Sequence, residues 1–352
     1  MYPRICIDLK KLNDNTEQLI NMTKRNHISS LFVVVKVLAG DLRTVSEIAK
    51  HDIAYIADSR IENLKQFAHI AKPKALMRLP MISEANRVVK YADLSLNSEL
   101  KTISKLNNAA KKLGKIHDII LMFDLGDLRE GVFYQDDYID LVDAILGLDN
   151  IRLRGIGTNL TCFGGVIPSH ENLSTLVKIA HSIENQFDIK LELISGGNSS
   201  SIHLFDTGKI PSDINCLRIG ESLMLARETA YGERINGLHE DVFTLEVELI
   251  EVKSKPSYPI GEIGMNSFGE VPSIIDQGDM VRGIAAIGKQ DIQLDNLFPI
   301  DSKVKVVGGS SDHLILDLSD TKYGVGDILQ FRVNYPGLLQ IMTSHYVKKD
   351  YL

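Results

Sequence analysis

Short apolar runs alternate with amphipathic segments over the first two-thirds of the chain. The apolar runs predict strands at Ile5–Leu9, Leu31–Val37, Ile53–Ala57, Ala75–Leu79, Ala92–Leu96, Asp118–Asp124, Leu153–Leu160, Leu191–Ile194 and Cys216–Ile219. Apolar residues recur three and four positions apart between these runs, which predicts helices at Asn13–Lys24, Arg43–Lys50, Ile61–Ala71, Glu99–Leu113, Asp137–Leu146 and Ser174–Gln186. Repeated strand and helix units predict a parallel sheet, and eight or so of them close a TIM-type (β/α)8 barrel.

The pattern changes after about residue 230. Polar and apolar residues alternate over 242–252, and runs punctuated by glycine and proline continue to residue 347, spaced as in a small β-barrel or sandwich. The predicted strands there include Met280–Ala286, Val304–Val307, Leu314–Leu318 and Ile328–Val333. We therefore predict an α/β fold in which a (β/α)8 barrel over residues 1–230 precedes a smaller, mainly-β domain over residues 231–352.

Composition narrows the possible partners and location. The 352 residues carry a formal charge of −7 with scattered lysines, so no long basic face is available for nucleic acid. The apolar runs are too short for a signal peptide or a membrane span, so we expect a cytoplasmic protein without a membrane partner. Cys6, Cys162 and Cys216 lie far apart in apolar surroundings, as buried reduced thiols do, so we expect neither disulfides nor a metal site.

Lys36 is the most informative residue in this pattern. It follows the apolar run 32–35 in a strand whose composition is typical of burial on both faces. A buried ammonium is costly, so such an amine is either held neutral or used in a covalent bond, and both routes suit a Schiff-base lysine. The alternative is a strand-end lysine whose side chain reaches water.

Two further loops follow predicted strands and carry candidate chemistry. The segment 195–201 combines two glycines with several hydroxyls, which can cradle a phosphate, although such a sequence also forms ordinary turns. Arg218 is followed by Ile219 and Gly220, where backbone amides can face an anion. Active sites of barrels gather where strands end, and Lys36, Arg129, Asn159, Ser199 and Arg218 fall at or near these ends.

The order of these pieces resembles the fold-type III pyridoxal-phosphate enzymes of the alanine racemase group. The matching features are Ile7-Asp8-Leu9 with Asn15, Lys36 at the cofactor lysine, Gly197-Asn198-Ser199, and Arg218-Ile219-Gly220. Four segments resemble the ornithine racemase branch more than alanine racemases proper: 36–41, 124–131, 258–262 and 308–313. The resemblance covers nearly the whole chain and implies a barrel that binds pyridoxal phosphate.

The resemblance also implies how the cofactor is held. Lys36 would bind pyridoxal phosphate covalently and then move the α-proton of the substrate. Arg218 would face the pyridine nitrogen, where a permanent cation opposes protonation of the ring; the alternative for Arg218 is a surface ion pair. Asn159 would orient Arg218 at a position where the family often has histidine. The remaining implied cofactor contacts are Asn198, Ser199, Ser200, Gly220, Glu221 and Tyr351.

Racemisation needs a second proton carrier on the face opposite the lysine. Alanine racemases supply a tyrosine from the partner subunit, within a Tyr-Gly pair, and no such pair occurs in residues 253–269. Tyr258 is the nearest candidate, although with Pro259 it can equally shape a turn. His313 is the alternative, because imidazole titrates near neutral pH.

Substrate contacts follow from the same resemblance. Arg129 would bind the substrate carboxylate in a bidentate pair, although Glu130 and Asp127 could equally hold it in a local salt bridge. A dibasic substrate such as ornithine also needs an acceptor for its distal ammonium. The candidates are Asp312, Glu262 and Glu221, and the sequence leaves the choice among them open.

We therefore predict an amino-acid racemase, an isomerase that acts on ornithine in preference to alanine, lysine or serine. Sites that borrow groups from another subunit require at least a homodimer. One alternative is a non-catalytic pyridoxal-phosphate carrier (homeostasis) protein, but such carriers consist of the barrel alone. Another is a fold-type III decarboxylase of basic amino acids, against which stand the short chain and the absence of that group's cysteine-containing motif.

Overall fold

The computed structural model describes residues 1–266, 268–269, 271 and 273–352. The chain forms two compact units. Residues Lys11–Glu240 make up one, here called the barrel unit, and residues Met1–Lys10 with Asp241–Leu352 make up the other, the β unit.

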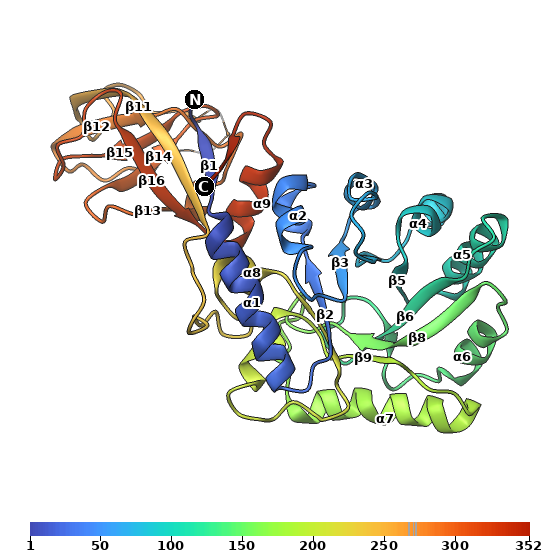
Figure 1. Cartoon of the computed structure of the whole chain (residues 1–352). Coiled ribbons are helices and arrows are strands. Elements are labelled where there is room, and N and C mark those ends of the chain that lie inside the picture. The colour runs from blue at the N-terminus through green and yellow to red at the C-terminus, as the bar shows by residue number, and fades with distance from the viewer. Residues whose placement is uncertain (267, 270, 272) are drawn as a thin grey trace. The chain divides into compact units, whose positions relative to one another are not determined.

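The barrel unit contains a closed sheet of parallel strands (Figure 1). Its eight barrel strands are β2 (Ser30–Val34), β3 (Tyr55–Asp58), β4 (Lys74–Leu76), β5 (Leu94–Asn97), β6 (His117–Asp124), β8 (Ile151–Thr158), β9 (Leu193–Ser195) and β10 (Cys216–Ile219). The sheet order is β5-β4-β3-β2-β10-β9-β8-β6, and the additional pairing of β5 with β6 closes the ring. The short β7 (Val132–Phe133) pairs beside β6. The predicted TIM-type barrel is confirmed.

Amphipathic helices surround the barrel strands, as the sequence predicts. They are α1 (Leu9–Arg25), α2 (Leu42–Ile48), α3 (Ile61–Gln66), α4 (Ala85–Tyr91), α5 (Leu100–Lys112), α6 (Ile139–Leu146), α7 (His170–Phe187) and α8 (Glu221–Leu225). Helix α5 buries Ile103, Leu106 and Ala110 at three- and four-residue spacing, so one face packs inward. A capping box between Ser169 and Asn172 starts α7. None of the helices in the described residues has the length and apolar character that crossing a membrane requires.

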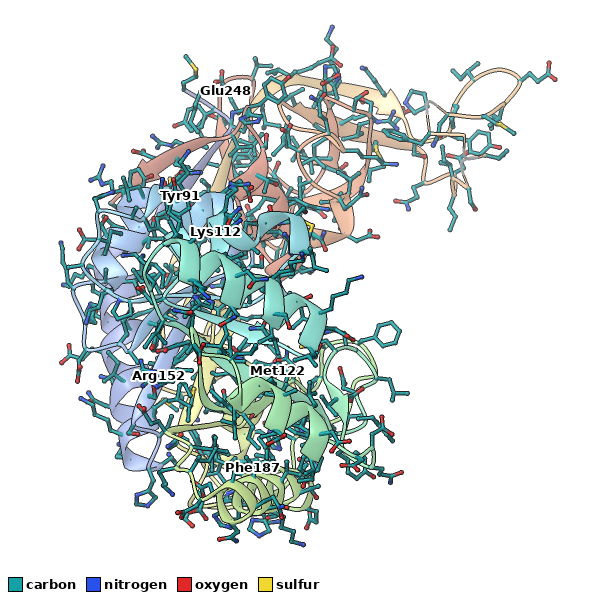
Figure 2. The ribbon with its side chains drawn as sticks, turned by 90° about the vertical axis from the view of Figure 1, so that its right-hand side faces the viewer. Tyr91, Lys112, Met122, Arg152, Phe187 and Glu248 are labelled. Atoms are coloured by element: carbon teal, nitrogen blue, oxygen red, sulfur yellow. The ribbon has the colours of Figure 1, made fainter. Side chains whose placement is uncertain are left out.

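Large apolar side chains fill the interior of the barrel. Phe32, Leu94, Ile120 and Met122 belong to one fully buried cluster, and Met122 is labelled on β6 in Figure 2. Burial on both faces explains the continuous apolar composition of these strands. The packed interior leaves the strand ends and their loops as the place for chemistry.

The β unit is mainly β-structure, which confirms the prediction, and its strands form a largely antiparallel sheet. Its strands are β1 (Arg4–Ile7), β11 (Phe243–Pro256), β12 (Asp279–Ala285), β13 (Leu297–Pro299), β14 (Lys305–Gly309), β15 (Leu314–Asp317), β16 (Ile328–Val333) and β17 (Lys348–Tyr351). Six of them follow the order β13-β16-β11-β12-β15-β14, and β1 pairs with β11 and with β17. The described residues of this unit also include helix α9 (Tyr335–Thr343).

The first strand lies elsewhere than we predicted. The segment predicted as Ile5–Leu9 forms β1, which pairs antiparallel with β11, Ile5 opposite Leu245, and parallel with β17. An apolar strand pattern shows burial but does not show which sheet the strand joins. The boundary between the two compact units lies between residues 240 and 241, whereas we predicted it between residues 230 and 231. The Asn15 side chain explains this shift, because it accepts from the His239 amide at 2.7 Å and donates to the Leu223 carbonyl at 3.1 Å.

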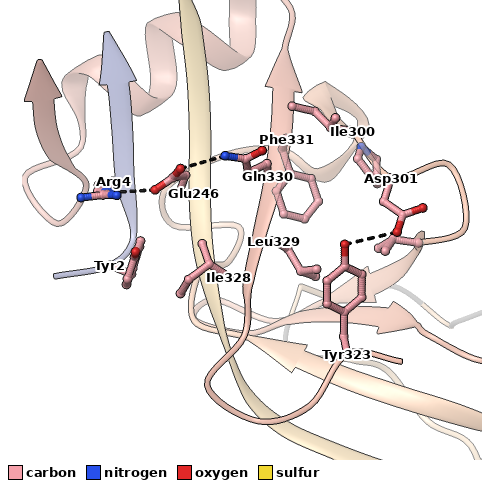
Figure 3. Close-up of a pocket in the computed structure, with 12 residues that line it drawn as sticks. Tyr2, Arg4, Glu246, Ile300, Asp301, Tyr323, Ile328, Leu329, Gln330 and Phe331 are labelled. Atoms are coloured by element: carbon pink, nitrogen blue, oxygen red, sulfur yellow. Dashed lines mark hydrogen bonds and ion pairs between the residues drawn. The ribbon is translucent and has the colours of Figure 1, made fainter. Parts of the chain in front are cut away.

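A cavity of about 310 Å³ lies in the β unit. Figure 3 shows that its polar groups face one another. Arg4 pairs with Glu246 at 2.7 Å, Gln330 donates to the same carboxylate at 2.9 Å, and the Tyr323 hydroxyl donates to Asp301 at 3.2 Å. These polar groups are therefore already paired with one another, so we assign them to stabilising the sheet and not to binding a ligand.

Candidate active site

Lys36 lies just beyond the end of a barrel strand. Strand β2 ends at Val34, and Lys36 begins a 3-10 turn (Lys36–Leu38) in which Val37 and Leu38 are buried and Lys36 is exposed. The predicted strand through Val37 is therefore too long, and of the two alternatives for Lys36 the structure shows the exposed residue at a strand end rather than the buried one. The chain turns here because the amide of Ala39 donates back to the carbonyl of Lys36, with Ala39 at a positive φ of 49°.

The charge of Lys36 reaches groups on three other strand ends. Burial raises the pKa of Asp58, at the end of β3, to about 6, against hydrogen bonds from Arg60 and Asn63 and the charge of Lys36. Burial likewise raises the pKa of Glu221, after β10, and loss of hydration around the sulfur raises the pKa of Cys162, after β8, although that residue as a whole is exposed; the Lys36 ammonium opposes both shifts. The fold thus gathers a lysine, two carboxyls and a thiol at one end of the barrel. Cys162 is exposed in this structure, which differs from the predicted burial.

The two loops predicted to bind phosphate meet each other. The Ser199 hydroxyl oxygen accepts from the amides of Gly220 at 3.4 Å and Ser222 at 3.3 Å. Asn198 caps the 3-10 turn Ser199–Leu204, because its side chain accepts from the Ser200 amide at 2.8 Å. The loop after β9 and the loop after β10 therefore form one continuous rim.

This rim fits a phosphate group. Ser200 is fully buried, and its hydroxyl has no hydrogen-bond partner within the described residues. Buried hydroxyls are normally paired, so an unpaired one indicates a missing partner such as a phosphate oxygen. A Cβ at Gly220 would lie 2.9 Å from the Val34 carbonyl oxygen, so only glycine permits this close approach of backbone. The donors are hydroxyls and amides, which suit a phosphate monoester.

Arg218 is a buried cation beside this rim. It is 3% exposed on β10, which rules out the surface ion pair that the sequence left open. Its guanidinium donates to the Ser195 hydroxyl, to the Thr158 carbonyl at 2.5 Å and to the Asn159 side chain at 3.1 Å. Burial lowers the pKa of Arg218. The Thr158 hydroxyl is also buried without a partner in the described part of the chain.

Arg129 forms the local ion pair that the sequence offered as an alternative to substrate binding. Its Nε and Nη2 donate to the Glu130 carboxylate, Nη2 at 2.5 Å from Oε1. Asn159 donates to the same Oε1 at 2.8 Å. Asn159 therefore contacts both Glu130 and Arg218, and Asn198 donates to its Oδ1 at 3.3 Å.

Asp127 fixes the loops that carry these groups. Its buried carboxylate accepts from the amides of Cys162 at 3.1 Å, Phe163 at 2.8 Å and Val166 at 2.9 Å. Burial alone would raise the pKa of Asp127, but the amide hydrogen bonds outweigh it and lower the pKa. Sequence reasoning missed this role, and it also missed Asp58, whose buried carboxyl lies in the field of Lys36. An aspartate that directly follows a predicted barrel strand, here Ile53–Ala57, could have drawn attention to Asp58.

The other predicted site residues belong to the β unit. Tyr258 follows β11 and is 42% exposed. Asp312 and His313 are exposed in the turn between β14 and β15, where His313 Nδ1 lies 3.4 Å from the Ser310 hydroxyl. Tyr351 lies on β17 opposite Ile7. Their roles, like those assigned to the barrel residues, stay predictions.

Known proteins are similar to this chain over its whole length. The family model described as the N-terminal domain of alanine racemase matches residues 7–228. The chain is 49% identical to an ornithine racemase of Acetoanaerobium sticklandii over 354 residues, covering 100% of both chains. It is 38% identical to a lysine racemase of Thermotoga maritima over 356 residues, covering 100% of this chain and 99% of the relative.

Solved structures share the fold at low sequence identity. An alanine racemase from Streptomyces lavendulae matches with a TM-score of 0.79 at 17% identity, covering 100% of this chain and 98% of that one. An alanine racemase from Bartonella henselae with covalently bound pyridoxal phosphate matches with a TM-score of 0.74 at 16% identity over 100% of both chains. These matches confirm the resemblance seen in the sequence. A barrel with a lysine, a hydroxyl-lined rim and a buried arginine at its strand ends, and relatives alike along its whole length, establish that this chain belongs to the alanine racemase family.

Proposed function

We propose that this racemase uses pyridoxal phosphate and interconverts the L- and D-forms of ornithine. The observation that carries the cofactor assignment is the unpaired, buried hydroxyl of Ser200 in the rim beside Arg218 and Lys36. The choice of ornithine rests on the relative that is 49% identical and named for that activity. The lysine racemase at 38% identity supports the broader class of basic amino acids.

Different residues of the barrel would bind different parts of the cofactor. Lys36 would bind it covalently, and the hydroxyls of Ser199 and Ser200 with the loop at Gly220 would hold the phosphate. Arg218 would face the ring nitrogen, while Asn159 and Asn198 hold the arginine and the rim in place. The backbone amide of Glu221, the first of α8, would be a further contact to the cofactor. Tyr351, at the end of β17, would contact the phosphate. Pyridoxal phosphate, when bound, withdraws electrons from the amino acid and so acidifies its Cα–H bond.

Two proton carriers are needed on opposite faces of the substrate. The Lys36 amine would hold or release a proton at Cα on one face. The Tyr258 hydroxyl would do so on the other, with the His313 imidazole as the alternative. Arg129 would bind the substrate carboxylate and so fix the direction of the Cα–H bond.

Glu221 is our choice for binding the distal ammonium of the substrate. Other carboxylates near this end of the barrel already accept hydrogen bonds from protein groups, namely Asp41, Asp58, Asp124, Asp127 and Glu130. The Glu221 carboxylate forms no hydrogen bond or ion pair with any described residue. It is half-buried and lies within the field of Lys36, whereas Asp312 and Glu262 are exposed residues of the β unit. A partly desolvated carboxylate attracts an ammonium more strongly than an exposed one does.

A homodimer would complete the site. The segment 258–275 of the β unit exposes several large apolar side chains, including Ile260 at 92%, Met265 at 76% and Ile275 at 78%. In the barrel unit, the loops joined by Asp127 expose Leu128 at 65% and Phe163 at 76%. Exposed apolar side chains concentrated on one segment are typical of an interface. We infer that a second copy of the chain covers both surfaces, and that Tyr258 acts in the partner's site. The cytoplasmic location stays a prediction.

A panel assay tests the proposed function. Purified protein loaded with pyridoxal phosphate is incubated separately with L-ornithine, L-lysine, L-alanine and L-serine, and the products are resolved on a chiral column. We expect D-ornithine to form fastest and the Lys36→Ala variant to form none. Release of carbon dioxide would support a decarboxylase instead. Cofactor binding without any product would support a carrier protein.

A further inference from the structure

Glu130 lies between two arginines of the candidate site. Its carboxylate accepts directly from Arg129, with Nη2 at 2.5 Å from Oε1. It reaches Arg218 through one intervening side chain, because Asn159 donates to Glu130 at 2.8 Å and accepts from Arg218 at 3.1 Å. One carboxylate is thus connected to both cations.

The loop places Glu130 firmly. A Cβ at Gly131, where φ is +128°, would lie 2.5 Å from the Asp124 amide nitrogen, so the loop closes tightly against β6 only with glycine. Asp127 joins the same loop to residues 162–166 through three amide hydrogen bonds. Both ends of the Asn159 amide are engaged, its nitrogen with Glu130 and its oxygen with Arg218, which fixes its orientation.

The charges along this connection influence one another. Arg218 donates only to neutral acceptors within the described residues, namely Ser195, Thr158 and Asn159. A buried guanidinium without a carboxylate is costly, and the charge of Glu130 opposes the loss of its proton. In return, hydrogen bonds from Arg129 and Asn159 and the charges of both arginines overcome the burial of Glu130 and lower its pKa.

Glu130 also determines which edge of Arg129 is open. The carboxylate occupies the Nε and Nη2 edge, and Nη1 makes no hydrogen bond to any residue of the described chain. A second carboxylate can therefore approach Nη1 while Glu130 keeps the guanidinium in place. This arrangement presents a preset donor to a substrate.

We propose that Glu130 is a positioning residue that sets the charge balance at Arg218 through Asn159 and the orientation of Arg129 toward the substrate carboxylate. This inference rests on the proposed function, because it assumes a cofactor ring at Arg218 and an amino acid at Arg129. Two separate effects follow from it. Loss of the carboxylate charge makes the field at Arg218 more positive. Loss of the carboxylate's position beside Nε and Nη2 lets the Arg129 guanidinium change its orientation.

Variants of the holoenzyme separate the two effects. Glu130→Gln loses the charge, Glu130→Asp keeps the charge but shortens its reach, and Asn159→Ala cuts the link to Arg218 while leaving the pair with Arg129. Glu62→Gln is the matched control, since Glu62 pairs with Arg87 at 2.7 Å on the surface. The readouts are KM and kcat for L-ornithine and the pH midpoint of the absorption change of bound pyridoxal phosphate.

The inference predicts a distinct pattern across these variants. In Glu130→Gln, KM rises about tenfold and the midpoint moves about one unit to lower pH, because a more positive field disfavours protonation. In Glu130→Asp, KM rises and the midpoint stays near that of the wild type. In Asn159→Ala, the midpoint moves while KM stays within about twofold. The control changes neither.

Two results would overturn the inference in different ways. If the wild type racemises ornithine but Glu130→Gln and Glu130→Asp change both readouts equally, the residue has only a structural role. If the wild type binds no pyridoxal phosphate and racemises nothing, the proposed function fails first and the inference with it.

Discussion

The hydroxyl oxygen of Ser199 lies 3.3 Å from the amide nitrogen of Ser222, which joins the loops that follow β9 and β10. Strands β9 and β10 are neighbours in the barrel and pair in parallel, so both loops leave the sheet at the same end. Their contact creates a rim of hydroxyls and amides that the protein's own hydrogen bonds hold in place. A preformed rim of this kind lowers the entropic cost of binding an anion.

Ser200→Ala should weaken cofactor binding without weakening the fold. The hydroxyl is buried and unpaired within the described residues, so its removal costs the apoprotein no hydrogen bond. We expect the dissociation constant for pyridoxal phosphate to rise about tenfold, with unchanged or slightly higher stability of the apoprotein. Ser201→Ala is the control, because that hydroxyl donates to the Gly196 carbonyl at 2.7 Å and its loss should cost about 1 kcal/mol. Equal effects of the two variants on stability would argue against the assignment.

Asp58 should make the apoprotein less stable as pH rises. Its pKa in the folded protein, about 6, lies above the ordinary value of 3.8, so the folded state holds the proton more tightly. The associated stability is present below about pH 4 and is lost as pH rises through 6, on the order of 3 kcal/mol in all. Asp58→Asn should flatten this dependence. Urea unfolding between pH 4 and 7 measures it, and parallel curves for variant and wild type would refute the prediction.

Tyr258→Phe should leave an enzyme that exchanges the α-proton of only one enantiomer. Loss of one proton carrier should slow interconversion at least about 100-fold. One enantiomer should still exchange its α-proton with solvent, because the Lys36 amine remains. Nuclear magnetic resonance in deuterium oxide follows each enantiomer separately, and we expect His313→Gln to behave like the wild type. One-sided exchange in His313→Gln instead of Tyr258→Phe would assign the second carrier to His313.

Glu221→Gln should change the choice of substrate rather than the chemistry. Without its charge, the site loses its attraction for a distal ammonium, so kcat/KM for ornithine should fall about tenfold or more. Norvaline has the same carbon chain without that amine, and its kcat/KM should stay within about twofold. Asp312→Asn is the comparison variant. A wild-type preference for ornithine that survives Glu221→Gln would remove Glu221 from this role while leaving the racemase assignment intact.

Charge placed in the exposed segment of the β unit should separate the subunits. Ile260→Asp combined with Ile275→Asp puts two carboxylates where the proposed interface is apolar, since these side chains are 92% and 78% exposed in one chain. We expect light scattering to show a shift from dimer to monomer, together with loss of activity. Ile116→Asp is the control, at a 63% exposed residue of the barrel unit. A wild-type protein that is already monomeric and active would refute the shared site.

Much of the fold could be read from the sequence. The strand Cys216–Ile219 has the predicted bounds, because a short apolar run with polar residues on both sides has few alternatives. The partners of strands could not be read in this way. Ile5 and Ile7 are fully buried in either sheet, so their pattern did not reveal that β1 belongs with β11.

The candidate site was predictable in its members but not in their contacts. Lys36, Ser199 and Arg218 were predicted because they fall at or near strand ends and match the cofactor positions of the family that the sequence resembles. The pairing of Arg129 with Glu130 depends on side-chain rotamers, which the sequence does not determine. The link from Glu130 through Asn159 to Arg218 joins three strand ends that lie far apart in the sequence. The exposure of Lys36 depends on a single turn of backbone after Val34, which the apolar run concealed.

The central claim is that this chain racemises ornithine, and a time course started from each pure enantiomer tests it most directly. The cofactor-loaded enzyme is incubated with L-ornithine in one vessel and D-ornithine in another, and chiral chromatography follows both. We predict that the two mixtures converge on equal amounts of L- and D-ornithine, with total ornithine conserved. An unchanged enantiomer in both vessels, or a loss of total ornithine with release of carbon dioxide, would contradict the claim.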